Sequence, residues 1–390
     1  MKWKNKGHEI DDFAMEICNI FDQKKGVIVY GAGNVGTRIY RALKRYDLFH
    51  KFVDNDTQKQ KSGYMGEQVV GSDQIIDGEY LLVVAVAGAY KQVSEQLQKM
   101  GLAEDKDFVN AEIFENKWLP TLLYYRYQHL YTNLAQICVT ERCTLKCRKC
   151  AHACNVVAMD EEDIPLDIAK KSADVFFSKY DCVGEFVLIG GEPLLYKNLI
   201  EIVEYIGYKY GSKIILFSIT TNGSIMPSDE LIKVCMRYNV MIRISDYSAS
   251  VPRLKNNYQK LYDKLKDLCV EVWKTNAENS WFDYGFDQTD PKKSIKDVME
   301  TFEHCKTQCR EISGEKYYYC VMAHTVAKNR NYNIGKADYI NLSDVKDRKI
   351  LLEFELGYNE KGFLDMCRIC RGKEAERFLI PAAEQEGTIK

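Results

Sequence analysis

Three closely spaced cysteines are the residues of this 390-residue chain that point most directly to chemistry. Cys143, Cys147 and Cys150 form a CxxxCxxC run just after an apolar, strand-like stretch, Leu134 to Val139. Thiolates at this spacing can bind three irons of a cubic [4Fe–4S] cluster. Because such clusters are normally held by four thiolates, the spacing leaves one iron free to bind another ligand.

A structural zinc ion is the alternative at these cysteines, and it would need a fourth ligand nearby. His152 or Cys154 could supply that ligand. The chain has 14 cysteines in all, and disulfides are rare in cytosolic proteins. Five scattered cysteines fit buried apolar thiols: Cys18, Cys138, Cys182, Cys235 and Cys269. A second group lies near the C-terminus and favours another metal site: Cys305, Cys309, Cys320, Cys367 and Cys370.

Polar and glycine-rich motifs follow three consecutive strand-like segments after the cysteines. Gly190-Gly191-Glu192-Pro193 ends the run E-F-V-L-I, Thr221-Asn222-Gly223 follows the next strand, and Ser245-Asp246 follows the third. A Gly-Gly turn that closes a strand is common. Its place one βα unit after the cysteines favours a functional interpretation.

Together, the CxxxCxxC run and the downstream G-G-E-P motif resemble the radical S-adenosylmethionine (SAM) superfamily. In that family the open iron chelates the amino and carboxylate groups of SAM, and one electron cleaves SAM to methionine and a 5′-deoxyadenosyl radical. The resemblance implies that Gly190 to Pro193 hold the SAM amine and that Asn222 and Ser245 face its ribose and carboxylate. Lys149 departs from the family pattern, which has an aromatic residue before the third cysteine.

The C-terminal cysteines resemble the twitch domain, a shortened SPASM domain that binds an auxiliary [4Fe–4S] cluster. Gly314 to Cys320 is similar to its cysteine hairpin, although the glycine-to-cysteine spacing is one residue longer, and Cys367-Arg-Ile-Cys370 is similar to its closing pair. The resemblance implies that four of the five C-terminal cysteines are ligands, with either Cys305 or Cys309 as the first. A zinc ribbon is the alternative.

A separate glycine motif lies near the N-terminus. Gly31-x-Gly33-x-x-Gly36 follows a buried-strand pattern, precedes a helix, and is followed about 20 residues later by Asp54 at the end of a second strand. In such motifs the helix N-terminus favours a phosphate, and the acidic residue binds ribose hydroxyls. The segment resembles small Rossmann domains of bacterial sugar-nucleotide and polysaccharide enzymes. This resemblance leaves a nucleotide sugar, NAD or a scaffold role open.

Strands alternate with helices on both sides of a connecting segment, which predicts an α/β protein. We expect a Rossmann-like nucleotide (sugar) binding domain with a parallel sheet over 1–115, and a connecting helix over 116–133. We expect a radical SAM core over 134–300, for which the resemblance implies a partial (β/α)6 barrel. A small twitch-like, cluster-binding domain is expected over 301–390. The loops after the barrel strands would gather the site residues.

Composition excludes several classes of partner. The net charge is −2 with acidic and basic residues intermixed, which does not indicate nucleic-acid binding. Residues Met1 to Gln23 are charged and lack the apolar core of a signal peptide, and no apolar run approaches the ~18 residues of a membrane helix. We therefore expect a cytoplasmic protein that binds neither membrane nor nucleic acid.

The expected function is a radical SAM enzyme that removes hydrogen from a carbohydrate-type, possibly nucleotide-linked, small molecule. It would oxidise an alcohol, as a dehydrogenase, or epimerise a carbon, with Cys154 or Cys182 as hydrogen donors; dehydration is a further outcome. A reducing partner such as flavodoxin or ferredoxin would supply electrons. Two alternatives remain: a peptide-modifying maturase, and a non-catalytic redox or nucleotide-sensing protein that carries a cluster.

Overall fold

The computed structural model describes residues 8–75, 78–86, 88–286, 293–305, 309–358 and 361–387. It divides the chain into two compact units, and the division falls between Asn133 and Leu134. Both are built from alternating strands and helices, which confirms the predicted α/β class. The units are described separately below.

The N-terminal unit contains a five-stranded parallel sheet in the order β3-β2-β1-β4-β5. Its strands are β1 (Val27–Tyr30), β2 (Phe49–Val53), β3 (Val69–Val70), β4 (Leu81–Val84) and β5 (Phe108–Asn110). This order is that of a Rossmann-like, doubly wound sheet. Strands β1 and β4 are buried throughout, as expected for the centre of a sheet covered on both faces. The short strand β3 was not predicted.

Helices accompany this sheet. They are α1 (His8–Asp22), α2 (Asn34–Arg45), α3 (Thr57–Ser62), α4 (Tyr90–Lys99), α5 (Ala111–Ile113) and α6 (Leu119–Tyr127), with one π-helical turn at Phe114–Trp118. Helix α1 was not predicted, although its buried residues recur at helical spacing: Ile10, Ala14, Ile17 and Phe21. The predicted connecting segment begins inside the π-helical turn and ends inside the first strand of the next sheet.

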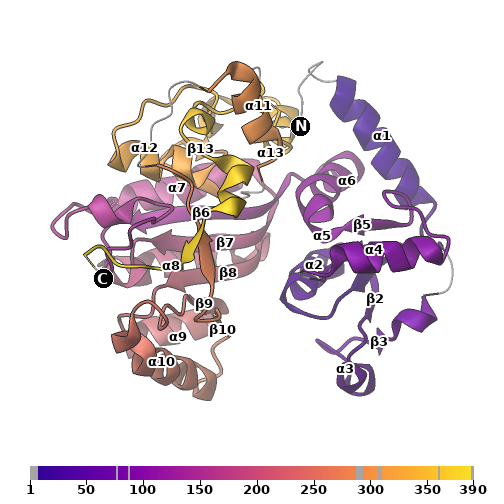
Figure 1. The fold of residues 1–390 in the computed structure, drawn as a ribbon, viewed down its shortest axis with the longest axis horizontal. Helices are drawn as coiled ribbons and strands as arrows, with labels where there is room; N and C mark the ends of the chain where they lie inside the picture. Colours follow the sequence, from indigo (N-terminus) through magenta and orange to yellow (C-terminus); the bar gives the residue numbers. More distant parts are fainter. Residues whose placement is uncertain are drawn as a thin grey trace. The chain divides into compact units, whose positions relative to one another are not determined.

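The C-terminal unit is organised around an eight-stranded sheet in the order β10-β9-β8-β7-β6-β12-β13-β14. Its strands are β6 (Tyr131–Thr140), β7 (Cys182–Gly190), β8 (Ile214–Thr221), β9 (Val240–Ile244), β10 (Val272–Lys274), β12 (Arg310–Ser313), β13 (Lys316–Tyr318) and β14 (Tyr339–Asn341). The pairs β7–β8, β8–β9 and β9–β10 are parallel. These strands form the partial barrel that was predicted (Figure 1).

Helices connect and flank these strands. They are α7 (Leu166–Lys179), α8 (Leu199–Tyr210), α9 (Asp229–Arg237), α10 (Lys255–Asp267), α11 (Ile295–Glu303), α12 (Thr325–Asn329) and α13 (Lys349–Glu355). Their amphipathic faces supply buried residues such as Phe176 of α7 and Ile202 of α8. The predicted boundary at residue 300 lies inside α11. Residues 287–292, which precede α11, lie outside the described residues.

The C-terminal cysteine hairpin extends the barrel sheet. Strand β12 pairs in parallel with β6, and β13 pairs antiparallel with β12 across a turn at Gly314, whose φ is +61°. Glycine adopts this left-handed conformation without a steric penalty. A separate two-stranded sheet joins β11 (Ser280–Phe282) to β15 (Leu379–Pro381). The region after residue 300 is therefore continuous with the barrel.

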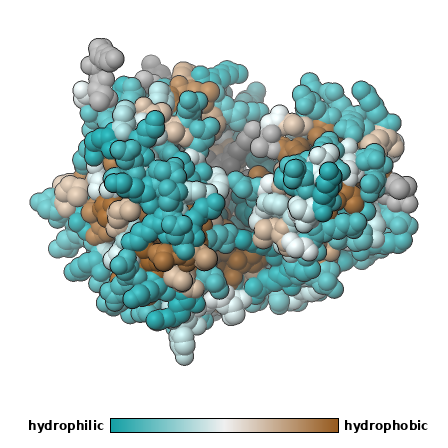
Figure 2. All heavy atoms as spheres, turned by 90° about the horizontal axis from the view of Figure 1, so that it is seen from below, coloured by the Kyte–Doolittle hydropathy of each residue, from teal (hydrophilic) through white to brown (hydrophobic). Residues whose placement is uncertain are grey.

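Apolar side chains fill the interior, whereas hydrophilic residues predominate on the face shown in Figure 2, with smaller hydrophobic areas between them. Among the described helices, none combines the length and the apolar character that a membrane crossing requires.

Candidate active site

A cavity of about 340 Å³ lies where the barrel strands end. Cys143, Cys147 and Cys150 line it together. Other lining residues come from the ends of β7, β8 and β9 and from the segments that follow them: Ile189, Gly190, Gly191, Thr220, Thr221, Asn222, Ser245 and Tyr247. The structure thus gathers the cysteine loop and the strand-end motifs at one place.

Nitrogen donors approach the sulfurs of Cys143 and Cys147. The side-chain amide of Asn222 donates to Cys143 Sγ at 3.5 Å, and the Leu145 backbone N–H donates to the same sulfur at 3.4 Å. The side-chain amide of Gln385 donates to Cys147 Sγ at 3.3 Å. Hydrogen bonds of this kind stabilise thiolates, so the donor set suits sulfur ligands of a cluster.

Burial acts on the three thiols in opposition to their hydrogen bonds. It raises the pKa of Cys143 to about 11 and that of Cys147 to about 12. A hydrogen bond from Cys154 instead lowers the pKa of Cys150 to about 6. Cys154 also lines the cavity and is buried. Cys150 is therefore the thiol of the three that ionises most readily without metal.

The G-G-E-P motif fixes the end of β7 against the start of the cysteine loop. Gly191 N–H donates to the Thr140 carbonyl at 2.9 Å, and Glu192 N–H donates to the Arg142 carbonyl at 2.9 Å. A Cβ on Gly190 would lie 2.2 Å from Thr140 O, and one on Gly191 would lie 2.3 Å from Arg142 O. These glycines are required by close backbone packing, in addition to lining the cavity.

Glu192 is fully buried behind the motif. Its carboxylate accepts hydrogen bonds from Thr221 Oγ1 at 2.7 Å, from Asn222 N at 2.8 Å and from Leu194 N at 3.1 Å. Burial raises its pKa to about 7 despite these donors. Its carboxylate therefore ties the ends of β7 and β8 together, and its contact with a SAM amine stays a prediction. Pro193 is buried at the start of a short 3₁₀ turn.

Asn222 and Ser245 both line the cavity. Asn222 is oriented by Thr144, whose hydroxyl accepts from the amide at 3.1 Å, while its own N–H is held by Glu192. Ser245 N–H donates to the Thr221 carbonyl at 2.9 Å. Both side chains are thus positioned beside the cysteines, and their contacts with ribose and carboxylate groups stay predictions.

One wall of the cavity is aromatic, and the sequence analysis did not predict it. Trp281, Phe282 and Tyr284 line the cavity from β11 and the segment after it. Tyr247 packs edge-to-face on Trp281, with ring centroids 5.4 Å apart. The W-F-D-Y run was visible in the sequence, but no motif linked it to the cysteines.

A partly buried ion pair lies on the same face of the barrel sheet as the cavity-lining Thr220. Arg243 of β9 is paired in register with the cavity-lining Thr220 of β8, so their side chains share a face. Nη2 of Arg243 donates to both carboxylate oxygens of Glu185, at 2.6 and 2.8 Å. Ser218 Oγ donates to Glu185 at 2.6 Å. This group forms a polar patch beside the cavity.

Within the described ranges, no three His, Cys, Asp or Glu side chains converge closely enough to hold a single metal ion. Zinc requires about four ligands at roughly 2.0–2.3 Å around one point. A cubic cluster instead takes one thiolate at each iron, so its sulfurs lie further apart.

Four of the five C-terminal cysteines influence one another electrostatically. Burial raises the pKa of Cys320, and the nearby thiols of Cys305 and Cys370 raise it further. Burial also raises the pKa of Cys367, together with the nearby thiols of Cys370, Cys305 and Cys320. Burial raises the pKa of Cys370 to about 12, and Gly372 N–H donates to its sulfur at 3.3 Å.

Cys309 has different neighbours. Burial raises its pKa, and the charges that act most strongly on it belong to Arg310, Glu185 and Arg243. Cys309 nevertheless packs against the same apolar core as Cys320, Cys367 and Cys370.

The N-terminal glycine loop has the close backbone packing expected of its motif at Gly31 and Gly36. Gly31 has a φ of +114°, and a Cβ on Gly36 would lie 1.9 Å from Gly31 O. A Cβ on Gly33 would meet no atom within 4 Å. The space beside the loop is therefore open at Gly33 and closed at Gly36.

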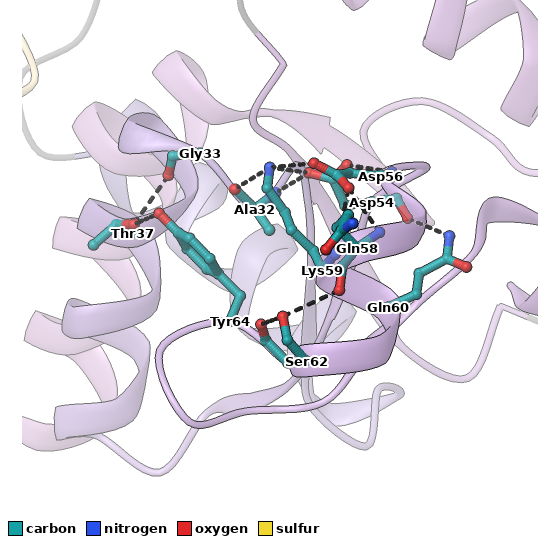
Figure 3. Close-up of polar contacts among 11 residues, drawn as sticks. Ala32, Gly33, Thr37, Asp54, Asp56, Gln58, Lys59, Gln60, Ser62 and Tyr64 are labelled. Carbon is teal, nitrogen blue, oxygen red and sulfur yellow. Dashed lines mark hydrogen bonds and ion pairs between the residues drawn. The ribbon is translucent and has the colours of Figure 1, made fainter.

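Asp54 contacts the glycine loop through Oδ2 and the turn that follows β2 through Oδ1. Oδ2 accepts from Ala32 N at 2.8 Å and lies 3.2 Å from Lys59 Nζ, while Oδ1 accepts from Asp56 N at 2.9 Å. Lys59 also donates to the Ala32 carbonyl at 2.8 Å. Burial alone would raise the pKa of Asp54, but these donors outweigh it and lower the pKa. Figure 3 shows Lys59 directed at this group. Ribose binding by Asp54 stays a prediction.

Family models match two segments of the chain. Residues 137–308 match the model described as Radical SAM superfamily, and residues 23–108 match the model described as C2185-like, N-terminal. The first match covers the three cavity cysteines and the strand-end motifs, and it supports radical SAM chemistry, with SAM and a [4Fe–4S] cluster, for this part of the protein. The N-terminal family match is to C2185-like proteins.

Relatives with curated names match only part of the chain. GTP 3′,8-cyclase of Rhizobium etli is 34% identical over 90 residues, or 23% of this chain and 25% of that protein. The enzyme of that name from Rhizobium leguminosarum bv. trifolii is 33% identical over 90 residues, also 23% of this chain. The match spans only about a quarter (25%) of the length of each of these relatives.

Solved structures show a distant similarity. BtrN in complex with AdoMet and 2-DOIA is 14% identical, with a TM-score of 0.38 over 65% of this chain and 91% of that one. SuiB from Streptococcus suis, bound to S-adenosylmethionine, is 16% identical, with a TM-score of 0.30 over 56% of this chain and 49% of that one. These values are too low to indicate a substrate.

Proposed function

We propose that this protein is a radical SAM enzyme that oxidises an alcohol carbon of a carbohydrate-type small molecule. The observation that carries the proposal is the shared cavity. Cys143, Cys147 and Cys150 line it together with Gly190, Gly191, Asn222 and Ser245. This shared lining supports a cluster and SAM bound side by side.

The cofactors supply the radical chemistry: when bound, cluster and SAM generate a 5′-deoxyadenosyl radical that removes a hydrogen atom from a substrate C–H bond. The protein has to position that bond and exclude water. Buried side chains and the aromatic wall of Trp281, Phe282 and Tyr284 serve to exclude water.

A polyol substrate needs polar partners in addition to aromatic faces. Arg243 and Glu185 provide charged hydrogen-bonding groups on the cavity face. The Nε of Arg243 is buried and has no hydrogen-bond partner in the structure. We assign this pair to the recognition of substrate hydroxyl groups, because a guanidinium donor and a carboxylate acceptor together can bind both ends of a hydroxyl dipole.

Oxidation of an alcohol requires an electron acceptor after hydrogen removal. We assign this role to an auxiliary cluster held by Cys305, Cys320, Cys367 and Cys370, whose thiols act on one another electrostatically. Cys309 is left out of this ligand set because its strongest electrostatic neighbours lie in the barrel. The open space at Gly33 is the place proposed for the phosphate of a nucleotide-linked substrate or of NAD.

Epimerisation is the second candidate, and Cys154 favours it. Its thiol is buried and lines the cavity, where it could return a hydrogen atom to the substrate. Cys182 is less suited to this role because it begins β7, whereas the cavity lies at the Gly190 end of that strand. Eight residues of strand separate them, about 26 Å at ~3.3 Å per residue.

Product analysis tests the proposal. The anaerobically reconstituted protein would be incubated in D₂O with SAM, a one-electron reductant and a panel of sugars, nucleotide sugars and cyclitols. A dehydrogenase yields 5′-deoxyadenosine and a product lighter by two hydrogens, whereas an epimerase incorporates deuterium at the reacting carbon. Turnover of a peptide but of no polyol would contradict the substrate class. Failure to form 5′-deoxyadenosine under every condition would contradict the enzyme assignment.

Substitution of Arg243 separates substrate recognition from SAM binding. Arg243→Leu should raise KM for the substrate or abolish product formation, while SAM still perturbs the cluster spectrum. Arg237→Leu is a matched control because that arginine forms an exposed pair with Glu204 on α8. Equal KM values for the two variants would remove Arg243 from the proposed site.

A further inference from the structure

The segment Ala383–Glu386, near the C-terminus, lies along the loop that carries the three cavity cysteines. Arg148 N–H donates to the Glu384 carbonyl at 2.8 Å, and Glu386 N–H donates to the Lys146 carbonyl at 2.7 Å. Cys147 and Gln385 form an isolated antiparallel bridge between these contacts. About 240 residues of sequence separate the partners, so this contact belongs to the folded C-terminal unit and not to the local motif.

The side chain of Gln385 is held in one orientation by its neighbours. Its Oε1 accepts from the Lys146 backbone N–H at 2.9 Å, which identifies this atom as the oxygen. Its Nε2 must therefore be the amide nitrogen, and it donates to the Ala383 carbonyl at 2.7 Å and to Cys147 Sγ at 3.3 Å. The amide group is thus fixed with an N–H directed at the sulfur.

We infer that Gln385 is a positioning residue that sets the reduction potential of the cluster bound by Cys143, Cys147 and Cys150. This inference rests on the proposed function. Hydrogen bonds to cluster sulfurs are among the factors that set Fe–S potentials, because they stabilise the more negative, reduced state. An N–H from Gln385 therefore makes the cluster easier to reduce, and its removal makes reduction harder.

Two substitutions separate this effect from a purely structural one. Gln385→Leu removes both the acceptor for Lys146 and the donor to Cys147. Gln385→Glu keeps an oxygen for the Lys146 N–H and replaces the donor with a carboxylate oxygen. A purely structural role predicts that the Glu variant resembles wild type. The inference predicts that the Glu variant has the lowest potential of the three proteins, because it adds negative charge beside the thiolate.

The test is a potentiometric titration of the reconstituted holoenzyme, followed by EPR of the reduced cluster at pH 8. Both variants should need a lower potential for half-reduction, with the reduced-to-oxidised ratio at a fixed potential falling about tenfold, or ~59 mV for one electron. Glu384→Gln is the control, because it breaks only the partly exposed ion pair with Arg148, and it should titrate like wild type.

Equal potentials for wild type and both Gln385 variants would overturn the inference. A second measurement covers the case in which a variant does not retain the cluster. In wild-type protein grown with amide-¹⁵N-glutamine, pulsed EPR of the reduced cluster should detect a coupled ¹⁵N nucleus, and its absence would overturn the inference. If wild-type protein forms no cluster, the proposed function fails together with this inference. If the cluster forms but wild type and both Gln385 variants have equal potentials, only this inference fails and the proposed function stands.

Discussion

The ammonium nitrogen of Lys149 lies 3.2 Å from Oδ2 of Asp283. Lys149 precedes Cys150, a proposed cluster ligand, at the position where related sequences are expected to have an aromatic residue. The same oxygen of Asp283 lies 2.7 Å from Nη1 of Arg371, which follows Cys370 of the proposed auxiliary site. One carboxylate thus connects the residues adjacent to a cysteine of each proposed cluster.

Removal of this carboxylate should destabilise the C-terminal unit. Asp283→Asn removes a carboxylate charge that pairs with two largely buried cations, Lys149 and Arg371, and removing one partner of a largely buried ion pair is destabilising. We expect a loss of about 1–3 kcal/mol in the free energy of unfolding. Glu204→Gln, which breaks an exposed pair with Arg237, should cost less than about 1 kcal/mol. Equal losses in denaturant titrations of the two variants would contradict the assigned role of Asp283.

Glu192 should make stability depend on pH. Its pKa is 4.5 in the reference state and is raised to about 7 in the folded protein by burial. Between these values the folded protein holds a proton that the unfolded chain has released. Stability should therefore fall as pH rises from about 4.5 through about 7, by roughly 3 kcal/mol at most.

Denaturant titrations of the cluster-free protein at several pH values would measure this slope. Glu192→Gln cannot titrate and should flatten it, even if the absolute stability changes through the altered hydrogen bonds with Asn222 and Thr221. A variant whose slope matches that of wild type across this pH window would show that Glu192 is not the group responsible.

The two glycines of the N-terminal loop should respond differently to alanine. Gly36→Ala places a Cβ 1.9 Å from Gly31 O and should strongly destabilise the N-terminal unit, whereas Gly33→Ala meets no atom and should fold normally. If a phosphate binds at this loop, Gly33→Ala should lose the thermal shift that NAD, UDP-sugars or CDP-sugars produce in wild type. No shift with any of these ligands in wild type would favour a scaffold role.

The C-terminal ligand set predicts distinct metal contents. Cys305→Ser should lose the auxiliary cluster and retain roughly half of the iron and sulfide, because the cavity cysteines are unchanged. Cys309→Ser should retain the full content, since Cys309 has its strongest electrostatic neighbours in the barrel. Iron and sulfide analysis of both variants after reconstitution distinguishes them. If Cys309→Ser loses half of the iron and Cys305→Ser keeps it all, Cys309 and not Cys305 is the ligand.

Regular elements followed from sequence periodicity wherever local pattern and tertiary packing agree. In α7, α9 and β9 the apolar spacing visible in the sequence also defines the buried residues of each element. Helix α1 was not predicted, because charged residues lie between its buried apolar residues Ile10, Ala14, Ile17 and Phe21. The cavity cysteines and glycines could be found because their spacing is local.

Contacts made by distant segments could not be predicted in the same way. Gln385 approaches Cys147 across most of the C-terminal unit, and no short motif marks it. The engagement of Glu192 and Asp54 by backbone N–H groups also depends on how neighbouring strand ends meet. Sequence spacing showed that these carboxylates lie near glycine loops, but only the three-dimensional structure shows which atoms they bind.

Addition of SAM to the reduced, anaerobically reconstituted protein is the most direct test of the central claim, which is that Cys143, Cys147 and Cys150 bind a cluster with one open iron. The account predicts that SAM changes the EPR spectrum of the reduced cluster in wild type, and that this signal is absent when all three cysteines are replaced by alanine. A spectrum that SAM leaves unchanged would contradict the account.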